Sequence, residues 1–437
     1  MEKSTAEDRH GKEAGTGSRQ DVEAESPFPP APVENGLAWM QVLGAFCLNL
    51  NTWGLMNAFG AFQTFYELDL LSSKSQSGIS WIGSTQAFLM FIISLLIGPI
   101  VDAGYLTSLL GLGSLLAILG LFMTSLCREY WQVFLAQALT MGLGFGCLYV
   151  PAPTVVSQYF HRNIALAMGA SSAGSAIGGV IYPIIFERLQ PRIGFGWATR
   201  VVAFIVLATS FPPLLLMRLK VAPSATTTRT KKYNLVDRAA FKDAPYILLN
   251  LGLIFGFMGF YIVFYYIQLY AREEGSISTN LESYLLVILN ASSLIGRCVL
   301  GYYADCIGAL NVQALVVLAG AILTFCLIVI QSPAALVVFC VIYGISAGAF
   351  MGLPAAAVVN LSGDRSKIGA RLGMTLAVVG CGVLVSNPIA GAILDGSGGW
   401  VGLIGWCGAL LVASFLSLVA SRTWKLGLGS GFAFKAI

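Results

Sequence analysis

The sequence has few charged residues, and this shortage indicates its class. Asp, Glu, Lys and Arg make up 11% of the 437 residues, whereas hydrophobic residues make up 57%. Soluble domains carry roughly 25% charged residues, so this chain cannot hide its apolar surface in a single water-soluble core. The net charge of +4 is too small to indicate binding to nucleic acid. A mean hydropathy of +0.78 indicates a protein whose partner is the lipid bilayer.

The residues that usually form metal or catalytic centres are also scarce. Only His10 and His161 are histidines, and the nine cysteines form no C-x-x-C pair. This pattern predicts no metal site, no disulfide framework and no cofactor. The G-x-x-x-x-G-K-[ST] phosphate loop does not occur in the sequence, so ATP-driven pumping is not supported. Together these absences predict that the protein is not an enzyme.

Long apolar stretches separated by short polar breaks occupy most of the chain. A bilayer core of roughly 30 Å needs about 20 helical residues, and this length divides the chain into twelve segments. The predicted helices are 37–65, 78–101, 107–126, 131–156, 164–188, 197–218, 245–270, 281–304, 310–330, 334–359, 368–394 and 400–421.

The polar segments divide these helices into two groups of six. Residues 1–36 have the composition of a disordered tail, and residues 221–243 form the longest interior break. The predicted domains are therefore a six-helix half at 37–220, a linker at 221–243, a second half at 244–424 and a tail at 425–437.

The positive charges indicate the orientation. With a cytoplasmic amino terminus, 18 of the 25 Lys and Arg residues fall inside and six outside, which leaves Arg297 in the membrane. This asymmetry follows the positive-inside rule. It predicts a multi-pass protein of the plasma membrane with both termini cytoplasmic.

Two short patterns recur at one offset. Gly98-x-x-x-Asp102 and Gly301-x-x-x-Asp305 are 203 residues apart, as are "PAPTVV" from Pro151 and "PAAAVV" from Pro354. Coincidence in Gly- and Ala-rich sequence is the alternative. A shared offset favours two pseudo-symmetric six-helix halves, an arrangement common in transporters.

At these residues the chain resembles the major facilitator superfamily, whose loop motif is similar to the two Gly-x-x-x-Asp elements. More narrowly it resembles fungal members of the monocarboxylate porter family. The stretches that carry this likeness are "ENGLAW" (34–39), "WGLMNAFGAFQTFY" (53–66), "ISWIGSTQAFL" (79–89), "MTSLCREYWQVFLAQ" (123–137) and "YFHRNIALAMGASSAGSAIGG" (159–179). The resemblance covers roughly residues 34–424 and implies the twelve-helix fold of that superfamily.

The chain departs from the family pattern at two charged positions. Carriers of small acids in the family have a lysine where Asn57 stands, and an aspartate where Ser293 stands. These departures and the abundant aromatic residues favour a cargo bulkier than a short-chain acid.

Arg297 is the charged residue placed deepest in an apolar stretch. An arginine at mid-bilayer costs about 2.5–3.5 kcal/mol, so it needs a partner. Its planar guanidinium matches a carboxylate, which predicts that it binds an anionic group of the cargo. The alternative is a structural tie to Asp305 or to carbonyl groups at a helix end.

Polar and aromatic residues share helix faces with this arginine or with each other. Helical spacing places Asn290, Ser293 and Arg297 on one face, and Asn49, Trp53 and Asn57 on another. Tyr261, Tyr265 and Gln268 form a third stripe. The resemblance implies that such helices line the transport path. The predicted substrate-binding residues are Arg297, Ser293, Asn290, Asn57, Trp53, Tyr261 and Tyr265.

The remaining candidate residues concern gating and protons. Asp102 and Asp305 are predicted to be gating or structural residues at helix ends. Carboxylates lie near predicted helix ends rather than at their centres, at Glu67, Asp69, Glu187, Glu282 and Asp395. Proton relays normally use intramembrane acids, so coupling to protons is left open.

These observations predict a secondary active, alternating-access transporter of a small organic anion or weakly acidic amphipathic metabolite. The expected partner is a small-molecule cargo, with or without protons, and the expected working unit is a monomer. The bulky cargo favours export of a secondary metabolite. The alternatives are a proton-coupled importer of short-chain monocarboxylates, a drug/proton antiporter and a non-transporting membrane sensor.

Overall fold

The structure is a computed structural model that describes residues 36–160, 164–219, 237–273, 279–330, 332–361, 368–396 and 398–426. In these ranges all the regular elements are helices. Helices are expected because backbone N–H and C=O groups find no water partners in a bilayer core and must bond within the chain. Ten segments of this part of the chain are long and apolar enough to cross a membrane. The predicted all-α membrane fold is confirmed.

Two irregular segments raise the number of spans from ten to twelve. The helix α9 (Ile164–Leu216) has 53 residues and is interrupted at Gly194, whose φ of 80° and ψ of 163° are not helical, so it contains spans 5 and 6. The first helical segment is broken at Ala58 and is not among the ten, but it supplies span 1.

The first half contains spans 1 to 6, of which spans 1 and 4 are built from several pieces. Span 1 consists of α1 (Gly36–Asn49), a π-helical turn (Leu50–Gly54), α2 (Leu55–Asn57) and α3 (Phe59–Phe65), and is followed by a second π-helical turn (Tyr66–Leu70). Spans 2 and 3 are α4 (Gln76–Asp102) and α5 (Leu106–Thr124), and span 4 consists of α6 (Tyr130–Val133), a π-helical segment (Phe134–Met141), α7 (Gly142–Tyr149) and α8 (Pro151–Tyr159).

The second half contains spans 7 to 12. Span 7 is α10 (Ala244–Glu273), preceded by a 3₁₀ turn (Arg238–Lys242), and span 8 consists of α11 (Thr279–Ile295), a π-helical turn (Gly296–Leu300) and α12 (Gly301–Ile307). Span 9 is α13 (Ala309–Cys326) with a 3₁₀ turn (Leu327–Val329), span 10 consists of α14 (Pro333–Gly352) and α15 (Pro354–Leu361), span 11 is α16 (Ile368–Asp395), and span 12 is α17 (Gly399–Leu426).

The repeated sequence patterns occupy equivalent places in the two halves. Pro151 begins α8 and Pro354 begins α15, so both patterns restart a helix after a break. Proline suits a first helical position because it has no N–H group to leave unbonded. The two Gly-x-x-x-Asp elements end spans 2 and 8, and each is followed by a turn glycine with positive φ, Gly104 (94°) and Gly308 (95°). A side chain is disfavoured at such angles.

One predicted boundary differs from the structure. Spans 5 and 6 were expected to be separated by a polar break at 189–196, but α9 stays helical up to Gly194. At the predicted end of the linker, residues Arg238–Lys242 form a 3₁₀ turn, and α10 begins at Ala244. The predicted tails at 1–36 and 425–437 and the remainder of the linker lie almost entirely outside the described residues.

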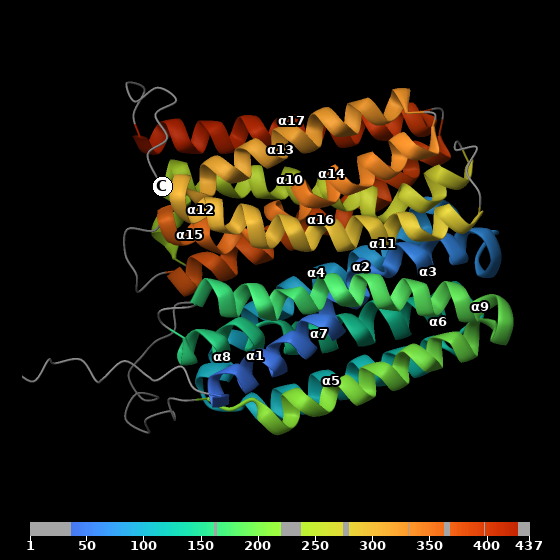
Figure 1. The fold of residues 1–437 in the computed structure, drawn as a ribbon, viewed down its shortest axis with the longest axis horizontal. Coiled ribbons are helices and arrows are strands. Elements are labelled where there is room, and N and C mark those ends of the chain that lie inside the picture. Colours follow the sequence, from blue (N-terminus) through green and yellow to red (C-terminus); the bar gives the residue numbers. More distant parts are fainter. Residues whose placement is uncertain are drawn as a thin grey trace, which may run out of the picture. The chain divides into compact units, whose positions relative to one another are not determined.

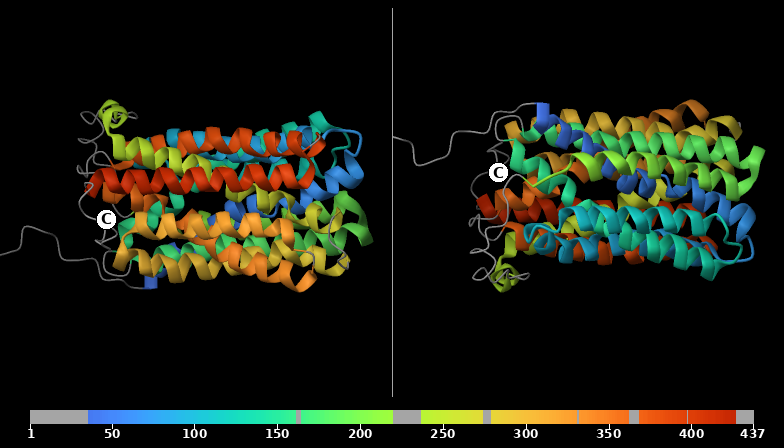
Figure 2. Two further views of the ribbon diagram at one scale, coloured as in Figure 1. Left: turned by 90° about the horizontal axis from the view of Figure 1, so that it is seen from above. Right: turned by 90° about the horizontal axis from the view of Figure 1, so that it is seen from below.

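The two halves pack side by side (Figure 1), with α16 running along α4 and α11 packing against α9. Figure 2 shows the spans from above and below, lying next to one another along most of their length. We call the end where α1 begins and α17 ends the terminal end. The opposite end, where α3 ends and α4 begins, is called the distal end.

Candidate functional site

Arg297 lies in the π-helical turn of span 8, between the two halves of the molecule. Its Nη1 donates to the Oγ atom of Ser175 and, at 3.4 Å, to the carbonyl oxygen of Ser172. Both serines belong to α9 in the first half. Within the described part of the chain its Nε atom is buried without a hydrogen-bond partner. The guanidinium thus joins the halves through neutral groups and keeps one donor unused.

The π-helical turn that carries Arg297 sits where spans 8 and 10 approach closely. A side chain at Gly348 of α14 would collide with the backbone of Ser293, and one at Gly296 would collide with the carbonyl group of Ile345. Small residues at such contacts allow helices to pack closely. π-helical turns are frequent at functional sites, since they alter the direction of side chains along a helix.

Aromatic side chains from both halves surround this region. The ring of Trp53 makes edge contacts with Tyr149 at 5.6 Å and with Phe91 at 5.7 Å between ring centroids. Phe91 in turn contacts Phe257 of span 7 at 6.2 Å, so the rings form a continuous path across the interface. The hydroxyl groups of Tyr149 and Tyr261 lie within electrostatic range of Arg297. Tyr149 is a neighbour of the arginine that the sequence did not predict.

Four of the predicted residues besides Arg297 carry buried polar atoms that find no partner among the described residues. They are both amide atoms of Asn57, the hydroxyl groups of Tyr261 and Tyr265, and the Oδ1 atom of Asn290. The four side chains are at most 3% exposed. Leaving such a group unbonded costs about 1–3 kcal/mol. Each of these groups is therefore a candidate to bind a ligand or water that supplies the missing partner.

Three polar side chains of the predicted stripes are used differently. The hydroxyl group of Ser293 donates to the carbonyl oxygen of Asn290 at 2.7 Å, within its own helix. Asn49 donates to Ser171 of α9 at 3.1 Å, and so fastens span 1 to span 5. Gln268 donates to Glu187 at 2.5 Å. The π-helical turn at Leu50–Gly54 also shifts Asn57 relative to Asn49, so the straight-helix spacing assumed for span 1 does not hold.

Asn387 of span 11 is a candidate that the sequence did not predict. It is fully buried, and both its side-chain amide atoms lack a partner in the part of the chain that the structure describes. The dipeptide Asn387–Pro388 in the middle of an apolar run was the only available signal. Proline cannot donate a hydrogen bond within a helix, and a buried amide beside it is unusual in a membrane span.

The two predicted gating residues lie at equivalent helix ends. Asp102 is the last residue of α4, and Asp305 lies in α12 close to the end of span 8. The side chains of both fall outside the described residues. Their gating role stays a prediction, and so does the alternative pairing of Arg297 with Asp305.

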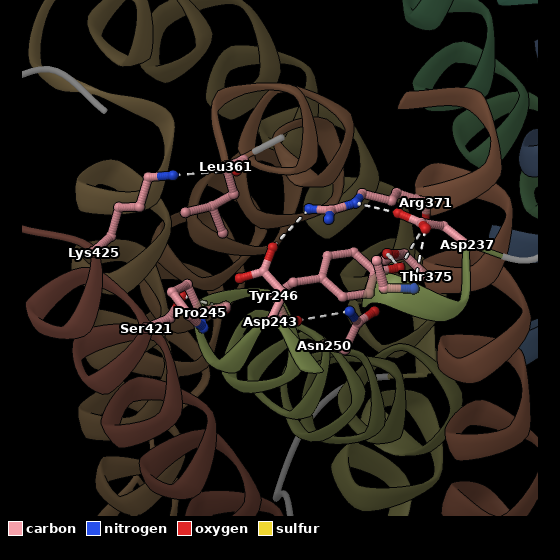
Figure 3. Close-up of polar contacts among 11 residues, drawn as sticks. Asp237, Asp243, Pro245, Tyr246, Asn250, Leu361, Arg371, Thr375, Ser421 and Lys425 are labelled. Atoms are coloured by element: carbon pink, nitrogen blue, oxygen red, sulfur yellow. Dashed lines mark hydrogen bonds and ion pairs between the residues drawn. The ribbon is translucent and has the colours of Figure 1, made fainter. Parts of the chain in front are cut away.

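A second buried arginine lies at the terminal end of the second half (Figure 3). Arg371 of α16 bonds to Asp237 through Nε at 3.2 Å and to Asp243 through Nη1 at 2.8 Å. Its guanidinium lies 5.2 Å from the ring centre of Tyr246, whose hydroxyl group donates to the Arg371 carbonyl oxygen at 2.7 Å. This ion-pair cluster fixes the described end of the linker onto spans 7 and 11.

Comparisons with known proteins agree with this architecture. Residues 42–370 match the model of the Major Facilitator Superfamily. The chain is 42% identical over 387 residues to the MFS-type transporter dbaD of Emericella nidulans, covering 88% of this chain and 86% of that protein. It is 38% identical over 373 residues to the Aspyridones efflux protein apdF of the same organism, covering 85% of this chain and 75% of that protein.

A solved structure extends the comparison to the fold. The structure of a POT family transporter in complex with 5-aminolevulinic acid superposes with a TM-score of 0.70, covering 88% of this chain and 96% of that chain. The sequence identity is 15%, so this likeness concerns the fold alone. With the family model matched over most of the chain and close relatives matched over most of their length, the protein belongs to the Major Facilitator Superfamily of membrane transporters.

Proposed function

We propose that this transporter carries a small organic anion or weakly acidic amphipathic metabolite by alternating access, as a member of the monocarboxylate porter type. Membership of the superfamily makes the protein a transporter and not an enzyme. The observation that carries the proposal is Arg297, a partly buried cation between the halves whose buried Nε donor is unused among the described residues and whose described partners are neutral. A carboxylate of the cargo would take both the unused donor and the charge.

The surroundings of Arg297 support an amphipathic cargo. The rings of Trp53, Phe91 and Phe257 offer apolar faces, whereas Asn57 and Tyr261 offer single unpartnered polar atoms. Sites for small molecules combine mainly apolar walls with a few well-placed polar groups. Such a site suits an aromatic or branched acid better than a short, fully hydrated one.

Export of a secondary metabolite is the proposed direction. The matched relative named as the Aspyridones efflux protein supports it. The distribution of Lys and Arg supports a cytoplasmic terminal end and a location in the plasma membrane. In this orientation the distal end faces outward.

Alternating access is supported by the bonds between halves at the distal end. Ser77 of span 2 donates to the carbonyl oxygen of Pro388 in span 11 at 2.8 Å, and Gln268 of span 7 donates to Glu187 of span 5 at 2.5 Å. These bonds would break when the halves separate there. We place the described arrangement in the state that is closed at the distal end.

Transport in proteoliposomes tests the proposal. A panel of aromatic carboxylic acids is compared with the corresponding neutral amides, with and without a pH gradient. We expect the acids to be carried and the amides not, and Arg297→Ala to abolish the difference. Arg200→Gln is the matched control, because Arg200 lies away from the site and bonds to Ser125. Equal transport of acids by the Arg297→Ala protein would overturn the proposal. Transport restricted to short-chain acids would favour the importer alternative.

A further inference from the structure

A chain of hydrogen bonds crosses between the halves at the distal end. Gln63 of span 1 donates to the Oγ atom of Ser80 in span 2 at 3.3 Å. Ser80 Oγ and the Tyr266 hydroxyl of span 7 are 2.5 Å apart, and Tyr266 donates to the carbonyl oxygen of Asn387 in span 11 at 3.3 Å. Either hydroxyl group can be the donor in the middle bond. All four spans meet at this chain.

Glu67 is attached to the start of this chain. It lies just beyond the end of span 1, in the π-helical turn Tyr66–Leu70. Its Oε1 atom accepts a hydrogen bond from the second N–H of Gln63 at 2.8 Å. Its Oε2 atom is buried and has no partner among the residues that the structure describes. A buried carboxylate with a single neutral donor is poorly stabilised as an anion.

The charged neighbours of Glu67 make its ionisation harder still. They are Glu273 of span 7 and Asp395 of span 11, both acidic. On its own turn Asp69 is exposed, and α4 contributes uncharged side chains to the bonds around it. Arg272, the cation next to Glu273 in sequence, lies 4.0 Å from Glu282 instead.

The two neighbouring carboxylates are better stabilised as anions than Glu67 is. Asp395 accepts the backbone N–H groups of Gln76 and Ser77, each at 3.3 Å, at the start of α4. Such N–H groups favour negative charge. Glu273 accepts from the indole N–H of Trp400 at 3.0 Å. Of the three acids, Glu67 is therefore the one expected to hold a proton.

We propose that Glu67 is a proton-binding site of the transport cycle, occupied when the halves close at the distal end and vacated when they open there. The inference rests on the alternating access of the proposed function. Opening admits water to the carboxyl group and stabilises its anion, while closing removes that water and requires the proton. In the proposed orientation the proton is taken up from the outer side.

The sign of the pH effect follows from the closed state. The pKa of Glu67 is raised to about 8: burial raises it most, Glu273 and Asp395 also raise it, and the hydrogen bond from Gln63 lowers it. Its ordinary pKa is 4.5, which applies to the hydrated open state. The closed state thus binds the proton more tightly and is favoured at low pH. As the pH rises between these two values, the ratio of open to closed protein rises by up to about tenfold per pH unit.

Accessibility of a buried thiol measures this equilibrium without any cargo. Ser84 lies one turn deeper than Ser80 on span 2 and is fully buried, and Ser84→Cys changes one atom. Purified protein is treated with a maleimide between about pH 6 and 8, and modification at residue 84 is quantified by peptide mass spectrometry, so the native cysteines stay in place. The rate is divided by that of the same protein carrying Glu67→Gln, which cancels the intrinsic pH dependence of the thiol.

We expect this ratio to rise with pH, approaching tenfold per unit, and Asp69→Asn to leave the rise intact. A ratio that stays constant with pH would overturn the inference. So would a modification rate of the Glu67→Gln protein that rises with pH more steeply than the ionisation of the thiol explains. Should Ser84→Cys lower the yield of folded protein, proton release measured on detergent-solubilised protein, with Glu67→Gln as reference, answers the same question.

Loss of the pH response with transport of carboxylates intact refutes only the role of Glu67. Intact transport by Arg297→Ala with the pH response preserved refutes only the proposed function.

Discussion

Two arginines of the second half, Arg371 and Arg297, differ in what they bond to. Arg371 is held by the carboxylates of Asp237 and Asp243 from the end of the linker and by the ring of Tyr246 from span 7. Arg297 bonds to neutral oxygen atoms of the other half and keeps an unused donor. A guanidinium with its charge neutralised by the protein stabilises the fold. One whose partners in the described part of the chain are all neutral is available to a ligand.

The same contrast applies to the two ends of the molecule. The ion-pair cluster at the terminal end lies within one half, so it can persist while the halves move relative to each other (Figure 3). The distal bonds of Ser80 and Ser77 cross between halves and would break in each cycle of the proposed alternating access. Bonds that break repeatedly are expected to be neutral, because separating buried ion pairs is costly.

The largest expected effect is on stability, from Arg371→Ala. Removing the arginine breaks both ion pairs, one of them with the Asp237 carboxylate, whose side chain is 8% exposed. Breaking a buried pair in this way costs about 3–5 kcal/mol. Thermal unfolding in detergent measures the loss. The affinity of the folded fraction for cargo is expected to stay at the wild-type value, and a fall in affinity as large as that of Arg297→Ala would erase the distinction between the two arginines.

Arg297→Ala should reverse this pattern. Losing a hydrogen bond to a charged group costs about 1.5–3 kcal/mol, which lowers cargo affinity about tenfold to a hundredfold. The thermal stability should change little, because the partners of Arg297 among the described residues are neutral, so no described anion is left unpaired. Arg297→Lys keeps the positive charge but loses the planar guanidinium with its paired donors. We expect its cargo affinity to lie between that of Arg297→Ala and that of the wild type. A stability loss comparable to that of Arg371→Ala would show that Arg297 is a structural tie.

Tyr261→Phe and Tyr246→Phe compare an unpartnered hydroxyl group with a partnered one. Tyr261 loses no bond to the described residues, so its stability should be unchanged or slightly higher, whereas cargo affinity falls about fivefold, equivalent to about 1 kcal/mol. Tyr246 loses its 2.7 Å bond to the Arg371 carbonyl and should lose about 1 kcal/mol of stability with no change in affinity. Binding competition and thermal unfolding of both proteins check the pair. Identical behaviour of the two would contradict the assignment of the site.

The smallest expected effect is that of Asp243→Asn. Its side chain is 29% exposed, and a half-exposed ion pair contributes about 0–1 kcal/mol because water screens it. Asp237→Asn, at the more buried partner, should cost more. Unfolding curves of the two single variants measure the difference. An Asp243→Asn protein that is the less stable of the two would show that burial does not rank these pairs.

Much of the fold could be predicted from the sequence. The apolar runs gave twelve spans because every backbone group in a bilayer must bond internally, and α4, α10 and α16 begin within two residues of the predicted positions. The offset of 203 residues identified Pro151 and Pro354 as equivalent helix starts. The exact position of the break between spans 5 and 6, at Gly194, and the 3₁₀ turn at the end of the linker could not be predicted, since they depend on local angles and on a distant arginine.

The site was predictable in its residue types but not in its contacts. Arg297 was conspicuous because a charge in an apolar run is expensive, and Tyr261 and Asn57 fell on predicted polar faces. Their unpartnered atoms could not be predicted, because a missing hydrogen bond depends on every neighbouring helix. Tyr149 and Asn387 were missed for the same reason. Glu67 looked like an ordinary acid at a helix end until its buried, acidic surroundings were placed.

The sequence by itself determined that this chain is an all-helical membrane protein built from two related halves, because composition and periodicity follow directly from the bilayer as a solvent. Only the tertiary structure decided which of its polar groups satisfy one another. That choice separates Arg371, whose charge is neutralised by carboxylates from before and at the start of span 7, from Arg297, whose partners across the interface are neutral. The physical reason is that hydrogen bonding and charge pairing depend on distances of a few ångströms between residues far apart in the chain.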